Sequence, residues 1–119
     1  MSKSKGKEGE DIAINYLIEK GYRLIERNFL YQHLEIDIIV EMDELIVFVE
    51  VKSRGINPLV PFNRVITRAK QRHIIKAADF YLKSNNINKE CRFDVITILR
   101  LVDGSIEINH IENAFIPQW

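Results

Sequence analysis

The sequence predicts an α/β domain in which one mixed β-sheet is flanked by helices. Helical periodicity appears at residues 8–20 and again at 63–84. Two short, strongly apolar segments between these helices, 34–42 and 45–53, are typical of strands. Near the end of the chain Asp103-Gly104 separates two further segments, which is one of the strongest signals of a β-hairpin.

The elements follow in order from local patterns. The first helix has an apolar stripe at helical spacing and a natural stop at Gly21; the stripe consists of Ala13, Ile14 and Leu17. Residues 22–30 alternate in part and predict the first strand. The loop from Gly55 to Pro61 contains two prolines, and Asn85-Asn86 ends the second helix. The predicted order is α-β-β-β-α-β-β, in which the last two strands are 91–102 and 105–111.

The composition is that of an ordinary soluble globular protein. A chain of 119 residues with 46% hydrophobic and 29% charged residues predicts one domain, 1–119. One cysteine excludes an internal disulfide framework, no apolar run approaches the roughly 20 residues of a membrane span, and the basic start lacks the apolar region of a signal peptide. We therefore expect a cytoplasmic protein. The 17 basic and 17 acidic residues cancel, so the net charge does not itself indicate a nucleic-acid partner.

Two charged residues interrupt the apolar third strand. Glu50 and Lys52 are two positions apart, so their side chains point to the same face. A charge beside such a hydrophobic run is costly unless another group compensates it. The sequence therefore predicts a compensating partner close to this strand.

A hairpin centred on Asp43-Glu44 would supply that partner. Asp37 then lies opposite Glu50, and Glu35 lies opposite Lys52, although a loop of odd length would shift this register. Opposed like charges destabilise a sheet by up to about 1 kcal/mol, so the two carboxylates favour a cation between them. The other face would be core, formed by Leu34, Ile36, Ile38 and Val40 against Val47, Val49 and Val51.

The first helix adds a third carboxylate. Glu10 begins the buried series that continues with the apolar stripe, where an acid is unexpected. Glu10, Asp37 and Glu50 together form a hard-oxygen site suited to Mg²⁺ or Mn²⁺. Such a site suits phosphodiester hydrolysis, with Lys52 positioned to hold the attacking water or to stabilise the transition state.

Each residue also has a simpler interpretation. Glu50 and Lys52 would be unremarkable in an edge strand that extends into solvent. Glu10 would complement the dipole of its helix if it lay near the N-terminus. Glu35 is better explained as an ion-pair partner of Lys52 that supports the site than as a metal ligand. The convergence of these residues on one face favours a functional site.

Three segments indicate a family resemblance: Gly6-x-x-Gly9-Glu10-Asp11-x-Ala13, Glu35-Ile36-Asp37-Ile38-Ile39, and Phe48-Val49-Glu50-Val51-Lys52-x-Arg54. In these segments the chain resembles the YraN-like family of small bacterial proteins, which is regarded as distantly related to archaeal Holliday-junction resolvases. The resemblance continues through Lys70-Gln71-Arg72, Arg92-Phe93-Asp94 and the segment from His110 to Phe115.

The resemblance implies a restriction-endonuclease-like fold with an α-β-β-β-α-β core. It also implies that the acids matching Glu10, Asp37 and Glu50 surround the metal and that the lysine matching Lys52 is catalytic. By analogy with resolvases, which cut two strands symmetrically, a homodimer is expected.

A basic stripe on the second helix is the expected nucleic-acid interface. Its residues recur every fourth position: Arg64, Arg68, Arg72 and Lys76. Lys70 falls among the apolar positions of the helix, so it either reaches towards the site or lays its stem on the core. With Arg54 these residues complete the expected nucleic-acid-binding set.

The sequence thus predicts a Mg²⁺- or Mn²⁺-dependent endonuclease that acts on DNA, including branched DNA. The alternative from another class is a nucleic-acid-binding or adaptor domain that keeps the fold without turnover. In a third interpretation the acidic cluster is a structural ion pair in a scaffold protein.

Overall fold

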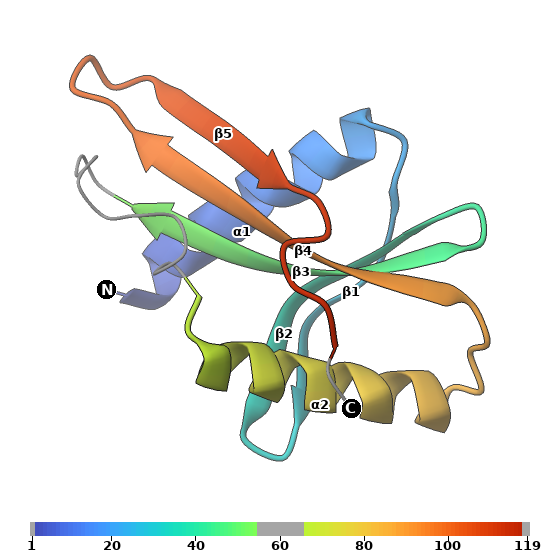
Figure 1. Ribbon diagram of the computed structural model, residues 1–119. Coiled ribbons are helices and arrows are strands. Elements are labelled where there is room, and N and C mark those ends of the chain that lie inside the picture. Colours follow the sequence, from blue (N-terminus) through green and yellow to red (C-terminus); the bar gives the residue numbers. More distant parts are fainter. Residues whose placement is uncertain (1, 55–65, 118–119) are drawn as a thin grey trace.

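The computed structural model describes residues 2–54 and 66–117, with the backbone alone for residues 2–6 and for Arg54. The described residues form two helices and a five-stranded sheet (Figure 1). In chain order the elements are α1 (Ser2–Glu19), β1 (Arg23–Tyr31), β2 (Leu34–Met42), β3 (Leu45–Arg54), α2 (Arg68–Ser84), β4 (Glu90–Arg100) and β5 (Ile106–Ile111). The predicted order α-β-β-β-α-β-β is confirmed.

The sheet is mixed, as predicted. Its strands lie in the order β1-β2-β3-β4-β5, and β3 pairs with β4 in parallel while the other neighbours are antiparallel. Both faces are covered: α1 packs on one through Leu17, and α2 packs on the other through Ile74 and Tyr81. The strand that contains Glu50 and Lys52, β3, is therefore the central strand of a sheet that is buried on both sides.

The β2–β3 hairpin has the predicted register. Met42 pairs with Leu45 across the two-residue loop, in which Asp43 adopts the left-handed conformation at φ +55°. Aspartate tolerates this conformation better than most residues, because its short polar side chain can hydrogen-bond locally. The ladder continues to the pair Ile38–Val49 and ends there. Asp37 and Glu50 therefore lie one position beyond the last pair.

The sequence predicted that Leu34, Ile36, Ile38 and Val40 lie on one face of the sheet. In the structure they lie on two faces, and the change occurs where this ladder ends. Ile38 and Val40 pack on the α1 side, whereas Leu34 and Ile36 pack in the cluster on the α2 side. At the same point the backbone N–H of Val51 donates a hydrogen bond of 2.9 Å to Asp37 Oδ2. The first half of β2 thus leaves β3, and a carboxylate is bound where the two strands separate.

The ends of both helices follow from local chemistry. At the end of α1 the Tyr22 N–H donates to the Leu17 carbonyl at 3.0 Å, and Gly21 adopts φ +103°, as its predicted role as a stop requires. At the start of α2 the Thr67 hydroxyl accepts from the Lys70 N–H at 3.1 Å. Ile66 and Thr67 are not helical, so α2 begins later than the predicted residue 63.

Gly21→Ala is expected to destabilise the protein by about 1 kcal/mol, because an L-residue is strained at positive φ. A Cβ at this position would lie 3.5 Å from Met42 Cε, an ordinary contact, so the cost comes from the backbone and not from a clash. Urea denaturation measures the change. The matched control is Glu19→Ala on the exposed last turn of α1, which should leave stability almost unchanged. Equal stability of Gly21→Ala and the wild type would contradict this account of the helix end.

Neither helix in the described part of the chain has the length and apolar character needed to cross a membrane. The hairpin predicted around Asp103-Gly104 is confirmed. Its loop is closed by a hydrogen bond of 2.9 Å from the Leu101 N–H to the Ser105 carbonyl, and Gly104 adopts φ +87°.

Candidate functional site

Glu50 of β3 lies in the interior of the molecule, whereas the Lys52 side chain is partly exposed. Glu50 is 4% exposed, and among the described residues the buried charged side chains are Glu50 and Asp94. Because β3 has neighbours on both sides, the interpretation of Glu50 and Lys52 as an edge strand is wrong. Burial of the Glu50 carboxylate needs compensation by nearby groups.

Two lysines partly compensate Glu50. The Nζ atoms of Lys52 and Lys70 each lie 3.7 Å from Glu50 Oε2, close enough for an ion pair but too far for a strong hydrogen bond. Glu50 Oε1 is buried and has no hydrogen-bond partner among the described residues. A buried acceptor left without a partner costs roughly 1–3 kcal/mol, so this oxygen is available to a ligand.

The Asp37 carboxyl lies beside Glu50. Burial, followed by the negative charge of Glu50, raises the pKa of Asp37 to about 7, while the hydrogen bond from the Val51 N–H opposes the rise. Two carboxylates that share a poorly solvated place cannot both ionise at low cost. A bound cation would remove this penalty.

Glu10 reaches the same region from α1. The helix approaches β3 closely here, since a Cβ at Gly9 would lie 3.2 Å from Ser53 Cβ. The negative charge of Glu10 also raises the pKa of Asp37, although by less than the charge of Glu50 does. Glu10 lies well inside α1, so its interpretation as a partner of the helix dipole at the first turn is wrong.

Arg27 of β1 is a member of this region that sequence reasoning missed. Its Nη2 lies 3.2 Å from Glu10 Oε1, and its Nη1 donates to Asp11 Oδ1 at 2.8 Å. The ion pair with Arg27 fixes the orientation of the Glu10 carboxylate. Any cation that binds Glu10 must compete with the Arg27 guanidinium. The strand position of Arg27 resembles that of any solvent-exposed residue of β1, so the sequence offered no signal for this contact.

Glu35 lies near the acids but not against its expected partner. Burial, then the charges of Asp37 and Glu10, raise the pKa of Glu35, whereas the charge of Lys70 opposes the rise. No ion pair joins the described side chains of Glu35 and Lys52, because the β2–β3 ladder ends before these residues could face each other. The expectation that Glu35 pairs with Lys52 is therefore wrong.

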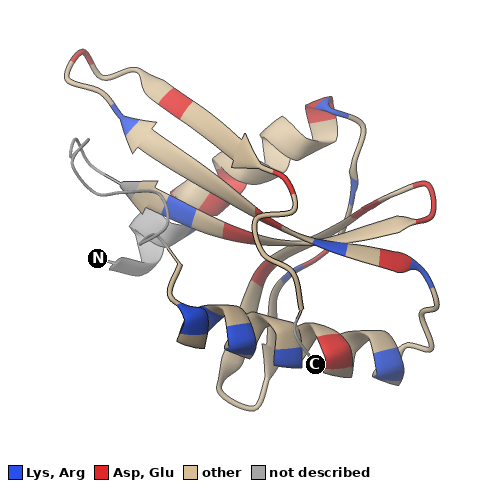
Figure 2. Cartoon of the chain, viewed as in Figure 1, with Lys and Arg blue, Asp and Glu red and all other residues tan. Residues whose placement is uncertain are grey.

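The expected nucleic-acid-binding residues are divided by the fold. Lys70 reaches the site, and Arg68, Arg72 and Lys76 lie along α2. Figure 2 shows that basic residues predominate on this helix and that acidic colour interrupts them, which the sequence assigns to Asp79. Lys83, farther along the helix, is paired with Asp79 at 3.0 Å. Arg64 and the side chain of Arg54 lie outside the described residues.

The donor atoms in this region are of the type that a hard divalent cation prefers. Within the described ranges no group of three or more His, Cys, Asp or Glu side chains is arranged as a formed metal-binding cluster. The carboxylates of Glu10, Asp37 and Glu50 nevertheless supply the oxygen donors that Mg²⁺ and Mn²⁺ prefer. The unpartnered Glu50 Oε1 is the observation that favours such a ligand.

A second polar network lies on the α1 side of the sheet, and the sequence did not predict it. Asp94 is fully buried, and its carboxylate accepts hydrogen bonds from Arg92 at 2.8 Å, from His110 Nε2 at 2.7 Å and from the Asn113 N–H at 2.9 Å. Burial alone would raise the pKa of Asp94, but the hydrogen bonds from His110 and Arg92 outweigh it and lower the pKa. The spacing of Arg92 and Asp94 on one strand face is the same signal that revealed Glu50 and Lys52.

Comparison with known proteins places the chain in a family. Residues 9–98 match the model of "Uncharacterised protein family UPF0102". The chain belongs to this family. The match covers Glu10, Asp37, Glu50 and Lys52 and extends through α2 to Asp94, and the resemblance to the YraN-like family is confirmed.

Relatives in UPF0102 are similar over nearly the whole chain. The UPF0102 protein of Persephonella marina is 47% identical over 112 residues, which cover 93% of this chain and 92% of that protein. The UPF0102 protein of Syntrophomonas wolfei is 43% identical over 116 residues, which cover 97% and 100%. The UPF0102 protein of Clostridium perfringens is 43% identical over 116 residues, which cover 96% and 95%.

Proposed function

We propose that this UPF0102 protein is a metal-dependent endonuclease of the restriction-endonuclease-like fold that hydrolyses phosphodiester bonds in DNA, branched DNA included. The observation that supports it best is the buried Glu50 carboxylate, which lies beside Asp37 and has one oxygen without a partner. A structural ion pair would satisfy both carboxylate oxygens, whereas this arrangement leaves one of them open.

Glu10, Asp37 and Glu50 would hold Mg²⁺ or Mn²⁺. When bound, the ion would supply Lewis acidity to a phosphate oxygen and lower the pKa of a water molecule. The backbone N–H of Val51 fixes the orientation of the Asp37 carboxylate through its hydrogen bond to Oδ2. Glu35 lies next to this carboxyl and adds negative charge, so it supports the binding of a cation without being required as a ligand.

The two lysines supply the positive charge of the site. Lys52 and Lys70 flank Glu50 at equal distances, and each side chain is 37% exposed, so both ammonium groups can reach a phosphate in solution. Lys52 Nζ would hold the attacking water or stabilise the charge that develops on the phosphate. Lys70 would attract the same phosphate from α2, a role that extends its expected place in the nucleic-acid interface. A homodimer would provide two such sites for symmetric cuts.

Lys52→Met is expected to lower the cleavage rate at least about 100-fold, because it removes a charge that acts on the developing transition state. The measurement uses labelled four-way junctions, flaps, duplex DNA and RNA with Mg²⁺ or Mn²⁺, and fluorescence anisotropy in EDTA reports binding separately. The matched control is Lys76→Met, which removes the same charge from the exposed side of α2. It should weaken binding slightly and leave the rate of the bound complex unchanged.

If the Lys52→Met variant cleaves DNA at the wild-type rate, the proposed catalytic role of Lys52 is wrong. The adaptor interpretation makes a different prediction: every substrate remains uncut with both metals, and binding persists in EDTA but falls steeply with salt. One observation favours this alternative: Arg68 and Arg72 form no ion pair with a described residue. Their charges are therefore available to bind phosphates.

A further inference from the structure

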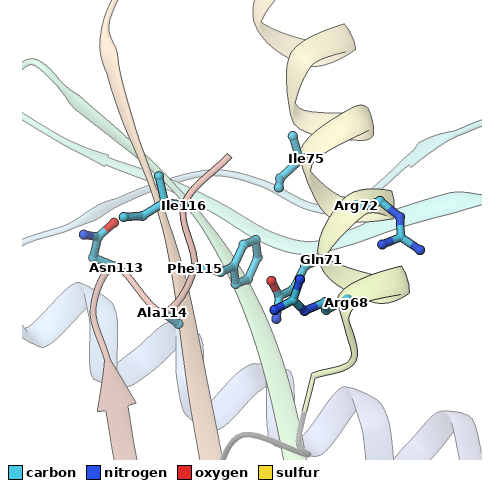
Figure 3. Close-up of a pocket in the computed structure, with 8 residues that line it drawn as sticks. All are labelled: Arg68, Gln71, Arg72, Ile75, Asn113, Ala114, Phe115 and Ile116. Carbon is cyan, nitrogen blue, oxygen red and sulfur yellow. The ribbon is translucent and has the colours of Figure 1, made fainter. Parts of the chain in front are cut away.

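A pocket of about 500 Å³ lies between α2 and the segment that follows β5 (Figure 3). Its volume falls within the range of about 300–1,000 Å³ that is common for small-molecule sites. One wall comes from α2 and the other from the chain at 113–116; the lining includes Arg68, Gln71, Arg72, Ile75, Phe115 and Ile116. The pocket therefore combines positive charge with apolar surface.

The charge in the pocket is not neutralised within the described chain. Arg68 and Arg72 are one helical turn apart, and neither forms an ion pair with a described residue. The other arginines with described side chains, Arg23, Arg27, Arg92 and Arg100, all pair with carboxylates of this chain. Figure 3 shows Arg68 and Gln71 beside the Phe115 ring, with Arg72 extending from the outer side of the helix. The pocket thus combines the Arg68 guanidinium beside an apolar wall with the positive charge of Arg72 at the rim, on the outer side of the helix.

The apolar wall is fixed before any ligand binds. The Phe115 ring stacks on Phe93 at 5.1 Å, and Phe93 stacks on Phe48 at 5.5 Å, so a column of rings connects the wall to the core. The Ala114 N–H donates to the Phe93 carbonyl at 2.7 Å, which ties the segment to β4. A wall held in this way loses little entropy when a ligand packs against it.

We propose that this pocket binds one unpaired nucleotide, with its base against the wall of Ile75 and Phe115 and its phosphate at Arg68, where Arg72 at the rim adds a second positive charge. Guanidinium groups bind phosphate oxygens through planar, bidentate hydrogen bonds. A base has an apolar face that packs on such a wall regardless of its identity. The inference rests on the proposed nuclease function for the source of the nucleotide, a nucleic-acid strand; a free nucleoside monophosphate shares the same chemistry.

The pocket is within reach of a strand bound at the candidate site. Lys70, which reaches Glu50, lies in the first turns of α2 between Arg68 and Gln71. A helix with its side chains is about 10–12 Å wide, and this width separates the two sides of α2. Because a nucleic-acid strand advances about 3.4 Å per nucleotide even when stacked, a few nucleotides connect the two places.

The test is binding of a labelled single-stranded thymidine oligonucleotide in EDTA, followed by fluorescence anisotropy. Arg68→Gln/Arg72→Gln is expected to weaken binding at least about 10-fold, since it removes both guanidinium groups from the phosphate. Ile116→Asp, a change at an exposed residue, should weaken binding to a similar extent because it places a negative charge at the pocket. The matched control Lys20→Gln/Lys83→Gln removes two charges from exposed positions outside the pocket and should cost less than about 3-fold. If the two double variants lose the same affinity for the oligonucleotide, the proposed nucleotide site in the pocket is wrong.

Competition identifies the ligand. Deoxyadenosine monophosphate should displace the oligonucleotide at concentrations where inorganic phosphate does not, and equal displacement by the two would overturn the role of the apolar wall. The cleavage assay separates this inference from the proposed function. If the wild type cuts DNA and Arg68→Gln/Arg72→Gln binds the oligonucleotide as the wild type does, the pocket is wrong and the nuclease stands. If nothing is cut but nucleotide binding is lost in that variant, the nuclease is wrong and the pocket stands.

Discussion

Asp37→Asn is expected to abolish metal-dependent cleavage and, at the same time, to stabilise the metal-free protein. The loss of cleavage should be at least about 100-fold, because the neutral amide is a poor ligand for a hard cation. The gain in stability should be about 1–3 kcal/mol near pH 8, since the substitution removes a buried carboxylate that is repelled by Glu50. Opposite effects on activity and stability are typical of a functional site.

The stability of the metal-free wild type should depend on pH with a definite sign. The pKa of Asp37 is raised from 3.8 to about 7 in the folded protein, so the folded state retains a proton that the unfolded state releases. The contribution of Asp37 is therefore fully present below about pH 4 and is lost as the pH rises through about 7. Urea denaturation in EDTA near pH 5 and pH 8 should show this loss in the wild type, and the loss should be much smaller in Asp37→Asn.

Divalent ions and a control variant complete this test. Mg²⁺ or Mn²⁺ should raise the melting temperature of the wild type near pH 8 and leave that of Asp37→Asn almost unchanged, because a ligand stabilises the state that binds it. The matched control is Asp79→Asn, whose carboxylate forms an exposed ion pair with Lys83 and should change stability by less than about 1 kcal/mol. A less stable Asp37→Asn variant near pH 8 would show that the Asp37 carboxylate is structural.

Asp94→Ala is expected to cost about 3–5 kcal/mol of stability, because it leaves the buried partners of a charge without compensation. The carboxylate joins Arg92 of β4, His110 of β5 and the backbone of Asn113, so its removal affects three parts of the chain. Urea denaturation measures the loss. The matched control is Asp103→Ala in the exposed turn, where the loss of the hydrogen bonds from Ser105 should change stability far less, because solvent can replace them.

The pH dependence of Asp94 has the opposite sign to that of Asp37. Its pKa is lowered in the folded protein, so its contribution is present above the ordinary value of 3.8 and is lost as the pH falls through the folded value. The wild type should therefore unfold in acid more steeply than Asp94→Asn. A loss below about 1 kcal/mol in Asp94→Ala would contradict the view that this network joins β4, β5 and the segment after them.

Local patterns were sufficient for the order of the elements and for one register, but not for the helix starts, which lie at Ser2 and Arg68 and not at the predicted residues 8 and 63. The loop at Asp43-Glu44 and the apolar periodicity of its flanking strands correctly predicted the pairing from Met42–Leu45 to Ile38–Val49. They failed beyond that point, because the separation of β2 from β3 depends on Leu34 and Ile36 packing towards α2. That packing partner is distant in the sequence, and strand alternation contains no information about it.

In the candidate site, too, some features follow from local patterns and others depend on contacts between distant elements. Glu50 and Lys52 were found because charge is anomalous in an apolar strand, and Lys70 was found because it falls among the apolar positions of its helix. The Arg27–Glu10 ion pair was missed, and the expected Glu35–Lys52 pair does not form, since both depend on how separate elements meet. The pocket at Arg68 and Arg72 is likewise a product of the chain end folding onto α2.

The sequence by itself determined the order of the elements, the hairpin register and the presence of three acids and a lysine that need compensation. These properties are read from neighbours in the chain, where periodicity and turn chemistry act. The tertiary structure alone decided that Glu50 is 4% exposed with one oxygen unpartnered and that Asp37 lies beside it with a raised pKa. Burial and electrostatic coupling depend on elements that are distant in sequence, because they arise when α1, α2 and β2 close around the central strand.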